Sequence, residues 1–77
     1  MNKQRRAELT AIASGLSELK DRLEACKEQE EEYVEGMPEN LQGSEKHDQA
    51  EERVNNLEEA CSSLDDALTN INDTIEI

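Results

Sequence analysis

Apolar residues recur along the first part of the chain at intervals that alternate between three and four positions. With Leu9 taken as heptad position a, the pattern runs through residue 33, and Glu30 is the one charged residue in it. The a positions are Leu9, Leu16, Leu23 and Glu30, and the d positions are Ile12, Leu19, Cys26 and Tyr33. A spacing held over about four heptads predicts an α-helix over residues 3–35 that packs along one side against another helix.

The second part of the chain carries the same alternation. Its d positions are Ala50, Leu57, Leu64 and Ile71, and its a positions are Val54, Cys61, Leu68 and Ile75. The polar residues between them are mostly acidic, so the apolar residues form one stripe on a helix. The pattern predicts a second helix over residues 45–75.

Residues 36–44 interrupt both patterns and predict a turn. Gly36 can adopt the left-handed conformation that ends many helices. Pro38 disfavours helix at the residue before it and suits the start of a short helical turn that Gly43 would end. Ser44 is a suitable N-cap for the second helix, because its hydroxyl can accept a hydrogen bond from a free backbone N–H.

A connection this short makes consecutive helices antiparallel neighbours. The predicted fold is therefore all-α: an antiparallel two-helix coiled-coil hairpin that forms a single unit over residues 1–77. Met37 and Leu41 are the large apolar residues of the turn, and we expect them to fill its closed end. The predicted core and assembly residues are Leu9, Ile12, Leu16, Leu19, Leu23, Val54, Leu57, Leu64, Leu68 and Ile71.

Two alignments of the antiparallel helices, or registers, would place the a residues of one helix opposite the d residues of the other. In the preferred register the numbers of facing residues add to 80, which pairs Tyr33 with His47 and brings the basic N-terminus near the acidic C-terminus. In the alternative they add to 87, which places Cys26 beside Cys61. Interaxial distances of about 8–10 Å make a strain-free disulfide there unfavourable.

A single seam between two helices gives a small protein little stability, because area burial and the entropic cost of ordering nearly cancel. Small residues widen the apolar stripe on both predicted helices and would let another helix approach. They are Ala11, Ala13, Gly15 and Ser17 in the first half and Ala60, Ala67 and Thr74 in the second. We therefore expect a homodimer that forms a four-helix bundle, with a monomeric hairpin and a complex with another protein as alternatives.

The charge of the chain is strongly negative and unevenly distributed. Twenty Asp and Glu against eight Lys and Arg give a formal net charge of −12. Residues 1–27 carry six basic and four acidic groups, and residues 28–77 carry two and sixteen. This field repels nucleic acids and anionic membranes, so the expected partners are a second copy or a basic protein. No signal peptide or membrane span is evident, and two cysteines fit a reducing cytoplasm.

Pairs of carboxylates recur every seven residues at positions e and f of the second half. This acidic stripe consists of Glu51, Glu52, Glu58, Glu59, Asp65 and Asp66. One interpretation is a solvated outer face that keeps the protein soluble. The other is a strip that binds a basic groove, where it would mimic nucleic-acid phosphates. The heptad itself imposes the spacing, so the spacing does not separate the two.

The sequence offers no recognisable catalytic, cofactor or metal site. His47 is the single histidine, which excludes a site with several His ligands, and we expect it near Tyr33 at the closed end. Cys26 and Cys61 lie at heptad core positions and outside any CxxC pattern. Neither an EF-hand loop nor a phosphate-binding glycine loop is present. We expect no enzymatic activity.

The turn sequence Tyr-Val-Glu-Gly-Met-Pro-Glu-Asn-Leu-Gln-Gly-Ser-Glu at residues 33–45 precedes acidic heptads of the Leu-Glu-Glu-Ala kind. Together they resemble small acidic helical-hairpin proteins of bacteria and their phages, over about half of the chain. The resemblance implies a hairpin fold and a bacterial or phage origin. It transfers no active residue and therefore implies no activity.

These expectations lead to two hypotheses about function. The first is a non-enzymatic structural or interaction module that self-associates by coiled-coil packing and presents an acidic surface. The second is a phage-type inhibitor that occupies the basic nucleic-acid-binding groove of a host defence protein.

Overall fold

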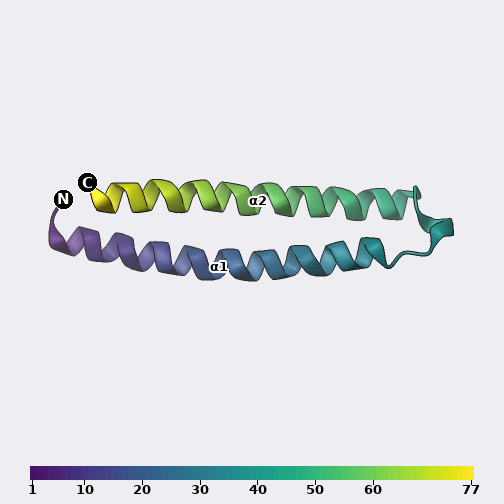
Figure 1. Ribbon diagram of the computed structural model, residues 1–77, viewed down its shortest axis with the longest axis horizontal. Coiled ribbons are helices and arrows are strands. Elements are labelled where there is room, and N and C mark those ends of the chain that lie inside the picture. Colours follow the sequence, from purple (N-terminus) through teal and green to yellow (C-terminus); the bar gives the residue numbers. More distant parts are fainter.

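The chain forms two long helices joined by a short turn (Figure 1). In the computed structural model, which describes residues 1–77, α1 spans Lys3–Glu35 and α2 spans Glu45–Glu76. A single turn of 3₁₀ helix, η1, lies between them at Glu39–Leu41. The helices run antiparallel, so both termini lie at one end of a rod that measures 60 × 15 × 13 Å. The predicted all-α hairpin is confirmed, and the helix bounds agree with the predicted ones to within one residue.

Both helices begin at a polar side chain that accepts a backbone hydrogen bond. Asn2 Oδ1 accepts from the Arg5 N–H at 2.7 Å, and Ser44 Oγ accepts from the His47 N–H at 3.3 Å. Each cap satisfies one of the N–H groups that the first turn of a helix leaves without a partner. The predicted cap at Ser44 is confirmed, and the cap at Asn2 was not predicted.

The turn reverses the chain at its second glycine. Gly36 ends α1 in the right-handed region, at φ −82°, and its N–H donates to the Glu32 carbonyl at 2.9 Å. Gly43 has φ +82° and is the one residue with a positive φ. The prediction of a left-handed Gly36 is wrong, because Pro38 already disfavours helix at Met37 and α1 can stop without a left-handed residue. The predicted short helical turn before Gly43 is present as η1.

α2 turns its predicted stripe toward α1. Ala50 is fully buried and Cys61 is 6% exposed. The other a and d residues of the stripe are half-buried: Val54, Leu57, Leu64, Leu68, Ile71 and Ile75. The heptad pattern of the second half therefore predicts the face of α2 that lies against α1.

α1 turns only half of its predicted stripe toward α2. Its a residues Leu9, Leu16 and Leu23 are half-buried, as expected. Its second inward row is position e, which consists of Ala13 (9% exposed) and the half-buried Lys20, Lys27 and Val34. At 100° per residue, the centre of a face made of the a and e rows lies roughly 50° around the helix from the centre of a face made of the a and d rows. α1 is therefore rotated by about that angle from the predicted orientation.

The predicted d row of α1 is consequently exposed. Ile12 is 43% exposed, Leu19 53% and Tyr33 44%, and Cys26 is exposed as well. The prediction that these residues lie in the seam with the second helix is wrong. Their predicted role in assembly with another chain stays a prediction.

The register of the hairpin lies between the two predicted ones. Two ion pairs join the helices, Lys20–Asp65 at 2.7 Å and Glu30–Arg53 at 3.2 Å, and the paired numbers add to 85 and 83. The preferred register of 80 is therefore wrong, and no ion pair joins the basic N-terminus to the C-terminal acids. At the closed end Met37 is buried, at 8% exposed, whereas Leu41 is 40% exposed.

Candidate interaction surfaces

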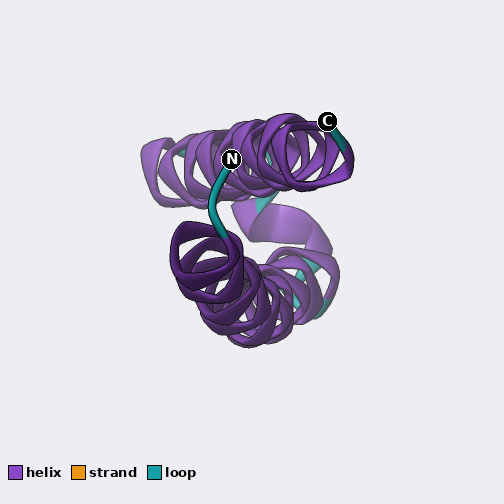
Figure 2. Cartoon of the chain, turned by 90° about the vertical axis from the view of Figure 1, so that its left-hand side faces the viewer, coloured by secondary structure: helices purple, strands orange, loops and turns teal.

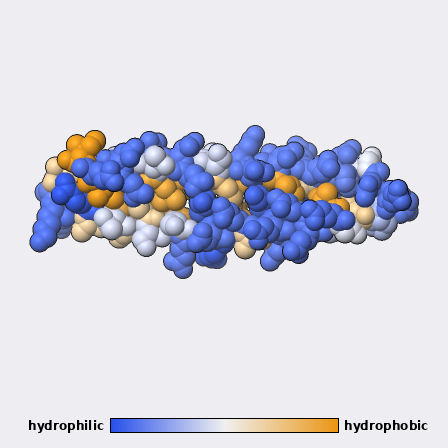
Figure 3. Space-filling model, in the orientation of Figure 1, coloured by the Kyte–Doolittle hydropathy of each residue, from blue (hydrophilic) through white to orange (hydrophobic).

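An apolar row runs along the side of α1 that no other element covers. We call Ile12, Leu19, Cys26 and Tyr33 the outer line. Its members are seven residues apart, so they lie on one side of the helix over about 30 Å. In the view of Figure 3, hydrophobic atoms form an interrupted band along the middle of the rod, where the two helices meet, flanked by hydrophilic groups.

The row of residues beside the outer line has no net charge, because its one acid is balanced by one base. On the side away from α2 the next row is position g, which consists of Glu8, Gly15, Arg22 and Gln29. Gly15 has no neighbouring atom within 4 Å of the place where a Cβ would stand, so the surface beside it is open. A second helix could approach this side of α1 without displacing any element.

The acidic stripe lies on the outside of α2, and all six of its carboxylates are exposed. Asp65 reaches across to Lys20 on α1, and Glu51 Oε1 lies 3.6 Å from His47 Nε2. The other four members, Glu52, Glu58, Glu59 and Asp66, form no ion pair. The sequence therefore predicted the place of this stripe, and the structure shows that two of its members are engaged within the chain.

Lys20 is held between carboxylates on both helices. Its Nζ lies 2.7 Å from Asp65 Oδ1 on α2 and 3.2 Å from Glu24 Oε1 on α1. The hydrogen bond to Asp65, followed by that to Glu24, raises the pKa of Lys20 from 10.5 to about 12. The aliphatic part of a lysine can pack in a seam while its ammonium reaches the edge, which explains how Lys20 occupies a core position.

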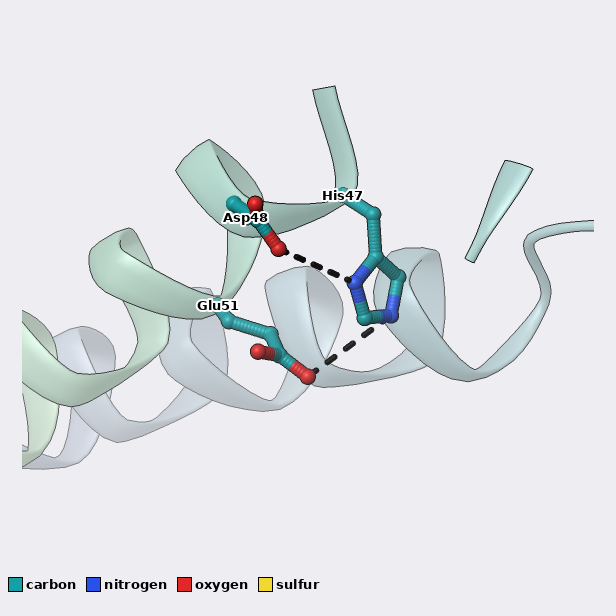
Figure 4. Close-up of side chains that lie close together, drawn as sticks. All are labelled: His47, Asp48 and Glu51. Carbon is teal, nitrogen blue, oxygen red and sulfur yellow. Dashed lines mark ion pairs between the residues drawn. The ribbon is translucent and has the colours of Figure 1, made fainter. Parts of the chain in front are cut away.

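His47, Asp48 and Glu51 lie together in the first turns of α2 (Figure 4). Nδ1 of the imidazole is 3.9 Å from Asp48 Oδ1, and Nε2 is 3.6 Å from Glu51 Oε1. The imidazole side chain is 14% exposed, and its Nδ1 is buried without a hydrogen-bond partner. The spacing His-x-x-x-Glu is the signal by which the sequence could have indicated this cluster.

The arrangement of this cluster suits ion pairs better than a metal ion. Asp48 lies beside Nδ1 of the imidazole and Glu51 lies beside Nε2, on the other side of the ring. One metal ion therefore cannot be bound both by Nδ1 with Asp48 and by Nε2 with Glu51. The three side chains could offer an imidazole nitrogen and carboxylate oxygens to a divalent cation, but the two acids are exposed. Tyr33, which the sequence placed beside His47, is exposed on α1.

Shallow hollows line the rod, and two of them are grooves between the helices. The largest, about 440 Å³, lies near the open end and is lined by Thr10, Ala13, Ser14, Ser17, Leu68, Asn72 and Ile75. Two of the predicted small residues of α1, Ala13 and Ser17, border it. Ala60 and Ala67 on α2 are half-buried. The other groove between the helices, of about 380 Å³, brings the carboxylates of Glu31, Glu35 and Glu51 around Val34 and Val54.

Neither helix has an apolar stretch long enough to cross a membrane. Comparison with protein families, with curated proteins and with solved structures finds no match for this chain. The outer line of α1 and the acidic stripe of α2 are therefore the two surfaces from which a function can be argued.

Proposed function

We propose that this chain is a non-enzymatic interaction module that self-associates through helix packing and presents the acidic stripe of α2 outward. The observation that supports this proposal most directly is the thinness of its core. Only four of the 77 residues are buried, and two of them are alanines. A small chain with so little buried side-chain volume gains stability when another helix covers its remaining apolar residues.

The cysteines and the charge of the chain are compatible with assembly in the cytoplasm. The exposed Cys26 and the buried Cys61 are both free thiols, which a reducing compartment preserves. The proposed setting is a bacterium, or the cytoplasm of a phage-infected host. The acidic stripe would keep the assembly soluble and would repel nucleic acid and anionic membranes.

Light scattering over a range of protein concentrations tests self-association. The chain has a mass of 8.7 kDa, so a dimer would approach twice that mass as the concentration rises. The expected result is a mass that moves from the monomer to the dimer between micromolar and millimolar concentration. A mass that stays at 8.7 kDa over that whole range would overturn the proposal.

A second candidate function is inhibition of a nucleic-acid-binding protein through the acidic stripe. The observation that favours it is the set of four exposed stripe carboxylates, Glu52, Glu58, Glu59 and Asp66, that make no ion pair within the chain. Regularly spaced, unpaired charges of this kind match a basic groove that normally holds phosphates. This candidate and self-association are compatible, because the stripe and the outer line lie on different helices.

Neutralising the stripe separates the two functions. The test variant carries Glu52→Gln, Glu58→Gln, Glu59→Gln and Asp66→Asn, the four stripe residues that make no ion pair. The control carries Glu18→Gln, Glu28→Gln, Glu32→Gln and Glu35→Gln, which removes the same charge from exposed positions of α1. The readout is displacement of a fluorescent DNA duplex from the DNA-binding proteins of a bacterial lysate. If the stripe acts as an inhibitor, only the α2 variant loses displacement, whereas an inactive wild-type chain rejects this candidate.

A further inference from the structure

We propose that a second copy of this chain docks on the outer line of α1, with the two α1 helices antiparallel. The two hairpins would then form a four-helix bundle in which α1 packs against α1 across a twofold axis. This inference rests on the self-association proposed above and specifies the face that mediates it.

The first support is the pattern of exposure on α1. Single exposed apolar residues are common on protein surfaces. Here Ile12, Leu19 and Tyr33 are 43%, 53% and 44% exposed and continue with Cys26 in one row along the helix. An apolar row along an uncovered helix face is the kind of surface that packs into the groove of another helix.

The second support is the exposed area of the hairpin. The accessible surface of the chain is 5779 Å², whereas a compact monomer of 8.7 kDa exposes about 4,700 Å². The excess of roughly 1,000 Å² is similar to the area of about 800 Å² that each partner buries in a standard interface. One interface of ordinary size would therefore bring the chain to the surface area expected of a compact protein.

The third support is charge, which favours α1 over α2 as the docking helix. The 32 residues of α2 include ten acidic residues and two basic ones, Lys46 and Arg53, which gives α2 a formal charge of −8. α1 contains nine acidic and six basic residues among its 33, a formal charge of −3. Contact between two α2 helices would bring two strongly acidic surfaces together, so repulsion is smaller between two α1 helices.

Charge also favours the antiparallel orientation. α1 begins with Lys3, Arg5 and Arg6 and ends in the acidic segment at residues 28–35. An antiparallel pair brings the basic start of each chain to the acidic end of the partner's α1 and its turn, where Arg6 faces Glu39 when the facing numbers add to 45, whereas a parallel pair sets like charges together. When the facing residue numbers add to 45, Leu19 of one copy lies against Cys26 of the other, and all four members of the outer line are covered.

A matched pair of lysine variants tests the docking face. Leu19→Lys places a charge in the outer line, and Ser14→Lys places the same charge about 140° away around α1, also at an exposed position. Leu19→Lys is expected to raise the dimer dissociation constant by on the order of 100-fold, because the lysine would be buried without a partner. Ser14→Lys is expected to change it by less than about threefold. Circular dichroism checks that both variants keep their helices.

The outcomes separate this inference from the proposed function. A dimeric wild type, a weakened Leu19→Lys and an unaffected Ser14→Lys support the docking face. A dimer that survives in both variants overturns the outer line as the interface and leaves self-association standing. A wild type that is monomeric at every concentration overturns both.

The native cysteine tests the orientation. A parallel pair would set Cys26 against Cys26, so mild oxidation of the wild type would give a covalent dimer through those two thiols. The antiparallel arrangement predicts no such dimer in the wild type. In the variant Leu19→Cys it predicts that a short bis-maleimide, which spans the distance between packed helices, joins the introduced thiol of one copy to Cys26 of the other in a covalent dimer, which peptide mass spectrometry identifies. A Cys26–Cys26 crosslink in the wild type, or no crosslink through the introduced thiol in the variant, would overturn the antiparallel arrangement.

Discussion

α1 and α2 carry the same alternating apolar pattern and use it differently. α2 turns both of its apolar rows toward its neighbour, whereas α1 turns one apolar row inward and leaves the other exposed. The cause lies in the third row of each helix, position e. On α2 that row holds Glu51, Glu58 and Asp65, which favour water and fix the edge of the stripe. On α1 it holds Ala13 and Val34, with lysines between them that can pack by their aliphatic stems.

The end view makes the consequence visible (Figure 2). Each helix has a single neighbour and meets it along one side, so most of its circumference is uncovered. On α2 the carboxylates that flank the apolar stripe leave one face that can pack against another helix. On α1 the stripe is flanked by small residues and lysines, so either its a and d rows or its a and e rows can pack against another helix. Residues at equivalent heptad positions on α1 and α2 therefore contribute differently to the stability of the hairpin, and substitutions can measure that difference.

The largest expected effect separates the two apolar rows of α1. In solution dilute enough to keep the chain monomeric, Leu16→Ala should lower the free energy of unfolding by about 2 kcal/mol, since Leu16 packs in the seam. Leu19→Ala should change it by less than about 0.5 kcal/mol, because Leu19 is 53% exposed. Urea unfolding followed by circular dichroism measures both. Equal losses in the two variants would mean that α1 faces α2 with its a and d rows.

The second comparison concerns Gly43 and Gly15. Gly43 has φ +82°, so Gly43→Ala should cost about 1–2 kcal/mol from the strain of a Cβ in the left-handed region. Gly15 lies inside α1 with open space around its Cα, so Gly15→Ala should raise the stability of the monomer by about 0.5–1 kcal/mol. Thermal unfolding of the dilute chain should show shifts of opposite sign. A loss of stability in both variants would contradict the open surface at Gly15.

The sequence was sufficient to predict the elements and their order. Gly, Pro and Ser residues in the turn give local signals for where helices end and begin, and these signals need no knowledge of the tertiary fold. The face of α2 was predictable for the same reason, because its flanking carboxylates leave one apolar stripe. The acidic stripe was correctly placed on the outside of α2 as a consequence.

The rotation of α1 and the register could not be read from the heptads. The a/d and a/e seams of α1 share Leu9, Leu16 and Leu23, so choosing between them depends on pairs that form across the hairpin. Lys20–Asp65 and Glu30–Arg53 are such pairs, and only the arranged helices show that these groups meet. The exposed outer line and the cluster around His47 were missed because both depend on how the helices are turned.

The third comparison concerns the two N-caps. Ser44 Oγ accepts a hydrogen bond at the start of α2, beside the turn, where the chain is held on both sides. Asn2 makes the corresponding bond at the free end of α1, where the first turn can fray. Ser44→Ala should therefore cost about 1 kcal/mol in global unfolding, and Asn2→Ala only about a third of that. Urea unfolding gives both losses of unfolding free energy. A loss for Asn2→Ala as large as that for Ser44→Ala would show that the first turn of α1 is held as firmly as the first turn of α2.

The smallest expected effect comes from the ion pair that joins the two helices at Lys20. Its pKa is raised from 10.5 to about 12 by Asp65 and then Glu24, so the folded chain holds this proton more tightly than the unfolded chain does. The resulting stabilisation is fully present below pH 10.5 and is lost as the pH rises through about 12. Lys20→Gln removes it, so the difference in unfolding free energy between wild type and variant should be constant at neutral pH and shrink at high pH.

The difference in unfolding free energy between wild type and Lys20→Gln does not depend on the other titratable groups, because those groups titrate alike in both chains. Lys27→Gln is the matched control, because Lys27 is also half-buried in position e but its amine pairs with Glu31 on its own helix, at 3.8 Å. A bond to the other helix stabilises the closed hairpin, whereas a bond within one helix forms whether or not the hairpin is closed. If Lys20→Gln and Lys27→Gln have the same effect on unfolding, the Lys20–Asp65 pair does not help set the rotation of α1. The exposure of the outer line must then follow from the packing of Ala13 and Val34 alone.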